Sequence, residues 1–179
     1  MLANGRRLCN GMIMKRLSRK GIFILLACVA LAVFMIFKAK NTGTYKILEV
    51  YDGDTVEVDM QGTPEKIRFV GADTPETKDP RKPVQCYGPE ASAYTHKMLG
   101  NGARVRLVAD PLTSNRDLYG RLLRYVYLTD GTLYNKQLIQ KGFAHAYVGF
   151  PFTKTADFIK TQDLAKDSKT GLWASCPAS

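Results

Sequence analysis

The chain has 179 residues, of which 45% are hydrophobic and 23% charged, a composition that excludes wholesale disorder. Its formal net charge of +10 is concentrated at the N-terminus, because residues 1–40 contain eight basic and no acidic side chains. Residues 41–179 contain 18 basic and 16 acidic side chains. This larger part is therefore not strongly basic, and any contact with nucleic acid must come from locally placed cations.

An uncharged apolar segment, residues 21–37, follows the basic N-terminal residues 1–20. Its 17 residues are at the lower end for a transmembrane helix, and flanking lysines can extend it by snorkelling. The preceding basic residues predict a cytoplasmic N-terminus and an extracytoplasmic remainder. We expect a single-pass signal anchor in the cell membrane. Secretion after signal cleavage is the alternative, and Met14 is an alternative start to Met1.

After a linker of residues 38–43, the pattern indicates a domain over residues 44–176 and a tail of residues 177–179. Alternating side chains and turn residues predict five strands, which begin at Tyr45 and then cover residues 55–59, 66–70, 104–108 and 122–128. Helices are predicted from Gly88 to Gly100, from Tyr134 to Lys141 and from Thr155 to Asp167. In the last helix, Phe158, Ile159 and Leu164 are the expected core residues.

Five short strands with interleaved helices predict an α+β, mainly β fold. We expect a five-stranded barrel of the OB type with about three packed helices, preceded by one N-terminal transmembrane helix.

Two cysteines, Cys86 and Cys176, belong to the domain, whereas Cys9 and Cys28 belong to the N-terminal segment. In an oxidising compartment, two cysteines suggest one disulfide. The alternative is a pair of free thiols. A zinc site is poorly supported, because neither His96 nor His145 has ligand spacing with a cysteine.

Three clusters of polar residues carry candidate chemistry: residues 52–55, Arg68 with residues 73–76, and residues 119–121. Carboxylates from different loops can converge as oxygen ligands for calcium or magnesium. Glu76 could hold or deprotonate a water beside the metal. Arg68 and Arg121 are guanidinium forks suited to a phosphate and its transition state. Each cluster alone also has a structural explanation as a turn, a helix start or a solvated strand face.

Together these segments resemble the staphylococcal nuclease (thermonuclease) family. The resemblance rests on the order and spacing of the following motifs: residues 50–55, VYDGDT; 67–77, IRFVGADTPET; 87–93, YGPEASA; 117–121, DLYGR; and 171–173, GLW. It covers about Thr44 to Trp173 and is highly specific as a combination.

The resemblance implies an OB-type barrel and calcium-assisted hydrolysis of DNA, RNA or both, with attack of water on phosphorus and 3′-phosphate products. It implies that Asp54, Asp73 and the Thr74 backbone carbonyl bind calcium directly. Asp52 would support these ligands without binding the ion itself.

The same resemblance assigns the catalytic step to three side chains. Glu76 would order or activate the water, Arg68 would bridge the phosphate and the metal site, and Arg121 would stabilise the transition state. Tyr119 and Tyr147 are expected to stack on a nucleotide. A monomeric catalytic domain without an obligate protein partner is expected.

Two positions depart from the family pattern. Leu118 replaces a lysine that commonly contacts phosphate, and Gly149 replaces a second tyrosine on the base side. Two rival functions are a catalytically inactive OB-fold module that binds nucleic acid and a structural or adhesion protein. The chain keeps all five residues expected to carry the reaction, and this argues against both rival functions. These residues are Asp54, Arg68, Asp73, Glu76 and Arg121.

Overall fold

The computed structural model describes residues 28–29, 43–80, 83–100 and 102–177. By its internal contacts the chain divides into two units, residues 1–42 and residues 43–179. Except for Cys28 and Val29, the predicted membrane segment 21–37 lies outside the described residues. Within the described residues, no helix combines the length and the apolar character required to cross a bilayer.

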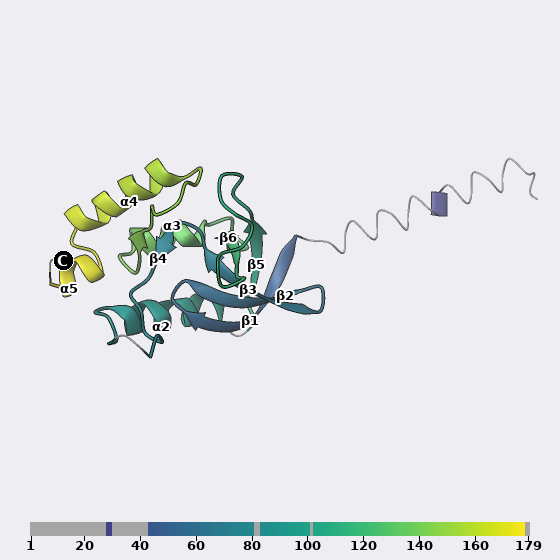
Figure 1. Ribbon diagram of the computed structural model, residues 1–179, viewed down its shortest axis with the longest axis horizontal. Helices are drawn as coiled ribbons and strands as arrows, with labels where there is room; N and C mark the ends of the chain where they lie inside the picture. Colours follow the sequence, from purple (N-terminus) through teal and green to yellow (C-terminus); the bar gives the residue numbers. More distant parts are fainter. Residues whose placement is uncertain (1–27, 30–42, 81–82, 101, 178–179) are drawn as a thin grey trace, which may run out of the picture. The chain divides into compact units, whose positions relative to one another are not determined.

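Five strands of the second unit form a closed barrel in the order β1-β2-β3-β6-β5 (Figure 1). Their bounds are Thr44–Asp52 for β1, Thr55–Met60 for β2, Thr63–Phe69 for β3, Arg104–Val108 for β5 and Leu122–Tyr127 for β6. The pairing of β3 with β6 is parallel, whereas the other four pairings are antiparallel. The barrel predicted from the strand pattern is confirmed.

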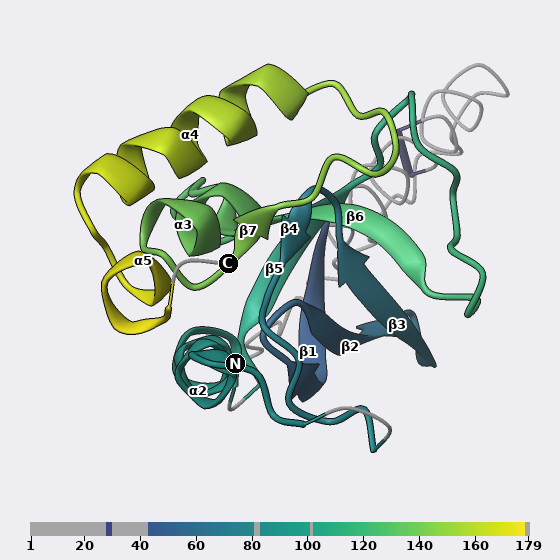
Figure 2. The ribbon, with the colours of Figure 1, turned by 60° about the vertical axis from the view of Figure 1, so that its left-hand side comes forward.

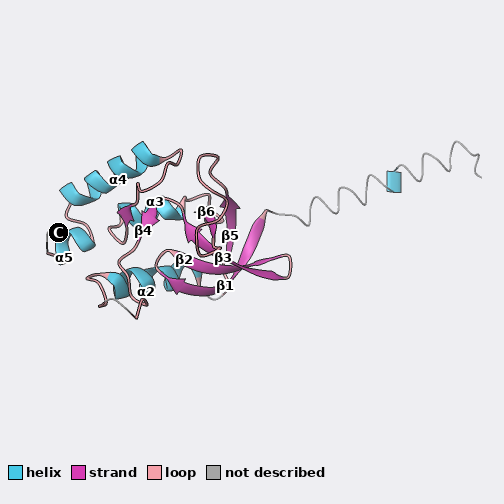
Figure 3. Ribbon diagram, in the orientation of Figure 1, coloured by secondary structure: helices cyan, strands magenta, loops and turns pink. Residues whose placement is uncertain are grey.

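Three longer helices pack around the barrel, as Figures 2 and 3 show. Helix α2 (Gly88–Leu99) packs on β1, α3 (Tyr134–Gln140) packs on β6, and α4 (Thr155–Asp167) packs on α3. Alternating strand residues fill the barrel, among them Val56, Val58 and Ile67, which are fully buried. Burial of these apolar side chains is the main driving force for closing the barrel.

The prediction for the core of α4 is correct at one position and wrong at two. Phe158 is fully buried, but Ile159 is 40% exposed and Leu164 is 59% exposed. The buried face follows the helical period through Phe158, Thr161 and Ala165. At about 100° per residue, Ile159 and Leu164 fall to either side of that face.

The sequence patterns did not predict three short elements. Strand β4 (Ala72–Asp73) pairs antiparallel with β7 (His145–Ala146), and the single helical turn α5 is Leu172–Ser175. Each strand has only two residues, too few to show alternation. The β4–β7 pair matters for the site because it fixes the backbone at Asp73.

The predicted disulfide is confirmed. Cys86, just before α2, is bonded to Cys176, which directly follows α5, and their Cα atoms are 5.8 Å apart. The bridge closes a loop with a sequence separation of 90 residues. Such a crosslink stabilises by about 4 kcal/mol in the chain-entropy model, because it restricts the unfolded chain.

Candidate active site

The predicted acidic and arginine side chains line one surface cavity of about 580 Å³. It is formed by the turn between β1 and β2, the end of β3, the loop after β4 and the loop before β6. The structure brings together six residues from segments far apart in sequence: Asp52, Asp54, Arg68, Asp73, Glu76 and Arg121.

Asp54 is held firmly in the β1–β2 turn, with only 6% of its surface exposed. Its Oδ2 accepts hydrogen bonds from the backbone N–H of Thr74 at 2.8 Å and from the Thr74 hydroxyl at 3.0 Å. Gly53 permits this approach, because a Cβ at that position would lie 2.7 Å from the Thr74 side chain. The Asp-Gly-Asp turn is thus shaped to bring a carboxylate against the loop after β4.

Arg68 bridges two of the predicted metal ligands. Its NH1 lies 2.9 Å from Oδ2 of Asp54, and its NH2 forms an ion pair with Asp73. NH1 also donates to the carbonyl of Ala72 at 2.6 Å. Strand β3 places the arginine here, since Arg68 is the register partner of Thr55 on β2. The guanidinium therefore lies between carboxylates from two separate loops.

Burial, assisted by neighbouring carboxylates, shifts two pKa values in the cavity upward. Burial raises the pKa of Asp52, and the charges of Asp54 and Glu76 raise it further. Burial also raises the pKa of Asp73; the charge of Arg68 opposes this rise, and that of Asp54 adds to it. Additional positive charge in this cavity would therefore be favourable.

The donor chemistry fits a hard cation. Asp54, Asp73 and a backbone carbonyl would supply only oxygen atoms, which calcium and magnesium prefer. In the part of the chain that the structure describes, no three Asp, Glu, His or Cys side chains gather as a metal cluster. The predicted calcium site has only two direct side-chain ligands, Asp54 and Asp73, and therefore does not form a group of three. Asp52 is held behind them by the hydroxyl of Thr77 at 3.1 Å.

Glu76 lies in the same cavity but also stabilises its own loop. Its Oε1 accepts hydrogen bonds from the backbone N–H groups of Thr77, Lys78 and Asp79 at 2.9, 2.7 and 3.1 Å. These bonds, first that from Lys78, lower the pKa of Glu76. The carboxylate is thus ionised at neutral pH. This suits it to orient a water molecule and makes it a weaker proton acceptor.

Arg121 is positioned by Asp117, a residue without a predicted role. Asp117 Oδ2 accepts a hydrogen bond from Arg121 Nε at 2.7 Å, and Oδ1 accepts from the backbone N–H groups of Tyr119 and Arg121. Arg121 NH1 reaches the Thr55 hydroxyl at 3.4 Å, beside Asp54. The signal was available, because an aspartate that precedes a tight turn often accepts from N–H groups two residues onward.

A second cavity of about 520 Å³ adjoins the first and contains both predicted stacking tyrosines. Tyr119 is 81% exposed, and the Tyr147 ring packs edge-on against Phe150 at a centroid distance of 5.3 Å. A Cβ at Gly149 would lie 2.5 Å from the Tyr147 hydroxyl, so this departure from the family pattern lets the ring fold back over the backbone. Leu118 is fully exposed at the cavity rim.

Two buried hydrogen bonds connect helices α2 and α3 to the Asp52-Gly53-Asp54 turn. The Tyr134 hydroxyl of α3 donates to Thr95 Oγ1 of α2, which donates to the Gly53 carbonyl at 2.7 Å. Gln85 supports the Glu76 loop in a similar way, since its Oε1 accepts the Glu76 N–H at 2.8 Å. No sequence motif marked these contacts, because each joins residues whose proximity depends on the folded barrel.

Comparison with known proteins agrees with this geometry. A family model described as staphylococcal nuclease homologue matches residues 66–175. The chain is 37% identical to the thermonuclease of Staphylococcus hyicus, over 90% of this chain and 99% of that protein. It is also 37% identical to the thermonuclease of Staphylococcus intermedius, over 86% and 95% respectively. Identity to the endonuclease YncB of Bacillus subtilis is 42%, over 69% of this chain and 58% of that protein.

Proposed function

This chain belongs to the staphylococcal nuclease family and is a metal-dependent nuclease acting on phosphodiester bonds, and we propose that its metal is calcium. The observation that carries the assignment is the convergence of Asp54, Asp73, Arg68 and Arg121 in one cavity. An interaction module that had lost catalysis would have no reason to keep two carboxylates and two guanidinium groups at these positions.

The proposed reaction is attack of water on phosphorus, with cleavage of the bond to the 5′ oxygen. The water oxygen bonds to phosphorus as that bond breaks, the 5′ oxygen leaves with a proton, and a 3′-phosphate end remains. Asp54, Asp73 and the Thr74 carbonyl would hold the calcium, and Asp52 would support them. When bound, the ion supplies positive charge that polarises the phosphate.

The chain's own residues supply the other parts of the reaction. Arg68 and Arg121 bind the phosphate oxygens and stabilise the extra negative charge of the pentacoordinate transition state. Glu76, fixed by three backbone N–H groups, orders the attacking water. Tyr119 and Tyr147 offer aromatic faces to the bases of a single strand of DNA or RNA.

The test is a nuclease assay of the full chain on DNA and RNA, with calcium, with magnesium or with a chelator. We expect calcium-dependent release of acid-soluble nucleotides. Asp54→Asn should reduce this activity steeply and weaken calcium binding, whereas Asp130→Asn, an exposed turn residue, should change neither. Full activity and unchanged calcium affinity in Asp54→Asn would reject the metal assignment. Activity that survives the chelator would reject metal dependence.

We also propose that residues 21–37 anchor the enzyme in the cell membrane, with its catalytic domain outside the cytoplasm. The basic residues 1–20 and the uncharged segment support this topology, and a disulfide suits an oxidising compartment. Protease added to intact cells should remove the domain if it is anchored outside. A domain protected until the cells are broken would contradict this placement, and activity in the medium alone would favour secretion.

A further inference from the structure

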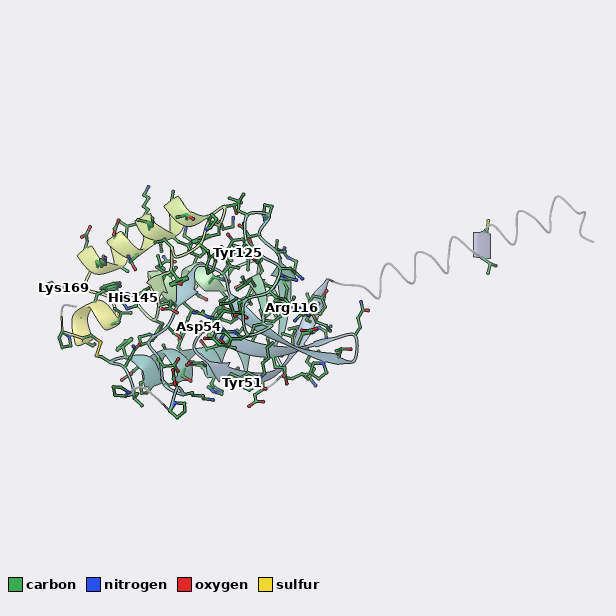
Figure 4. The ribbon with its side chains drawn as sticks, in the orientation of Figure 1. Tyr51, Asp54, Arg116, Tyr125, His145 and Lys169 are labelled. Atoms are coloured by element: carbon green, nitrogen blue, oxygen red, sulfur yellow. A yellow bond between two sulfur atoms is a disulfide. The ribbon has the colours of Figure 1, made fainter. Side chains whose placement is uncertain are left out.

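A third cavity, of about 920 Å³, shares no lining residue with the catalytic cavity and has no role in the mechanism above. It is formed by β7, the C-terminal half of α4, α5 and the disulfide. We name it the Trp173 cavity and define it by its polar lining residues, Gln85, His145, Gln162, Lys166, Lys169 and Trp173. Figure 4 labels His145 and Lys169 on the α5 side of the domain, and Asp54 nearer the barrel.

The Trp173 cavity presents hydrogen-bond donors. The amide oxygen of Gln85 accepts the Glu76 N–H, and that of Gln162 accepts the Ala146 N–H at 2.9 Å. Each glutamine therefore keeps its NH₂ group as a donor. The indole Nε1 of Trp173 is buried and has no hydrogen-bond partner among the described residues. A ligand that accepts hydrogen bonds can pair with the two glutamine NH₂ groups.

The charge of the cavity is positive. Lys166 and Lys169 line it, and none of the described lining residues carries a carboxylate. Lys166 Nζ lies 4.8 Å from the centre of the Trp173 ring, and His145 packs edge-on against the same ring at 5.0 Å. Lys166 and Lys169 supply the positive charge of the cavity.

The cavity adjoins the catalytic centre through one loop. Pro75 lines the Trp173 cavity, whereas its neighbours Thr74 and Glu76 line the catalytic cavity. Asp73 of the catalytic cavity is also the register partner of His145 in the β4–β7 ladder. The loop of residues 74–76 therefore forms part of the wall of both cavities.

We propose that the Trp173 cavity is a second binding site for the nucleic-acid strand and takes phosphate groups several nucleotides away from the bond that is cut. The inference rests on the proposed nuclease function. Phosphodiester oxygens match the donor-rich wall, and their charge matches Lys166 and Lys169. The Trp173 ring, which already packs against a lysine and a histidine, adds an aromatic surface to the site.

Trp173 provides a direct probe, because it is the only tryptophan of the chain. The full chain is titrated, with chelator present to prevent cleavage, against a thymidylate strand of about 12 nucleotides, a dinucleotide and inorganic phosphate. The long strand should change the Trp173 fluorescence, and the dinucleotide should not. Binding of the long strand without any change in Trp173 emission would overturn the proposal. Equal saturation by inorganic phosphate would overturn the assignment to a strand and indicate a small-anion site.

The matched variants are the double change Lys166→Ala and Lys169→Ala and, as control, Lys160→Ala. All three lysines are exposed, but Lys160 lines a different cavity beside α3. The double variant should raise KM for the long strand roughly tenfold at unchanged kcat, and reduce the salt slope of binding by about 1.4. It should leave dinucleotide cleavage unchanged. A double variant indistinguishable from Lys160→Ala on the long strand would refute the site.

The two proposals can fail separately. If the chain cleaves no substrate under any metal condition, the nuclease function fails, while the fluorescence and salt arms still decide whether the cavity binds a strand. If the chain cleaves both substrates and the double variant behaves as wild type, the cavity inference fails and the nuclease function remains.

Discussion

Asp110 offers a quantitative test of how a buried carboxylate stabilises this fold. The residue is only 4% exposed and lies outside the catalytic cavity. Burial raises its pKa, but hydrogen bonds from the Thr153 hydroxyl, the Tyr125 hydroxyl and the N–H groups of Thr153 and Leu112 outweigh that effect and lower it from 3.8 to about 2. The ionised form is thus preferred in the folded protein.

The shift converts to a pH-dependent contribution to the free energy of unfolding. At about 1.4 kcal/mol per pKa unit, it amounts to about 2 kcal/mol at pH 7. Because the folded pKa is the lower one, this contribution is complete above pH 3.8 and is lost as pH falls toward 2. At pH 3 about half of it should remain.

Asp110→Asn removes this contribution and turns an NH₂ group toward groups that also donate. We expect the variant to be less stable than wild type by about 2–3 kcal/mol at pH 7, and by about 1 kcal/mol less than that at pH 3. Urea unfolding followed by circular dichroism at the two pH values measures both differences. Asp130→Asn, in an exposed turn, is the control and should show a much smaller change. An Asp110→Asn deficit that is the same at both pH values would refute the reasoning.

Three further predictions concern the site and the crosslink. Arg121→Lys keeps the charge but loses the planar fork, so kcat should fall by ~10²-fold, which corresponds to about 2.7 kcal/mol of transition-state stabilisation. The melting temperature should not change. A kcat near that of wild type would show that Arg121 is only a general phosphate contact. Gly53→Ala places a methyl group 2.7 Å from the Thr74 side chain, so stability should fall by about 1–3 kcal/mol and activity should fall with it; a fully active, equally stable variant would show that the turn tolerates the methyl. Reduction of Cys86–Cys176 should lower the melting temperature while calcium binding persists, and two thiols alkylated in native protein without reductant would contradict the bridge.

The barrel could be predicted from sequence because its strands carry strong local signals. Residues 55–59 alternate clearly, and Gly and Pro residues mark the turns around them. The β4–β7 ladder could not be predicted, since two-residue strands have no periodicity and depend on tertiary contacts. Ile159 and Leu164 were misplaced for another reason: an apolar side chain on a helix need not face the core, and the helical phase is set by what packs against Phe158.

The catalytic cavity shows the same division. The roles of the acidic and arginine residues could be predicted from the resemblance of their motifs to the staphylococcal nuclease family, since each cluster alone also has a structural explanation. Their supports are ordinary residues such as Thr95, Tyr134 and Gln85, and hydrogen bonds that span 42 residues, as from Thr95 to Gly53, leave no local trace. Asp117 is also a supporting residue, but its role could have been predicted, because an aspartate before a tight turn commonly accepts hydrogen bonds from the N–H groups of that turn.

The parallel pairing of β3 with β6 has a consequence for the biosynthesis of this enzyme. Arg68 and Arg121 belong to the two sides of that seam, and about 50 residues of chain separate them. A ribosome-bound chain that ends before residue 121 lacks the second guanidinium and the strand that closes the barrel. Hydrolytic capacity therefore requires synthesis of at least the first 127 residues, because β6 ends at Tyr127.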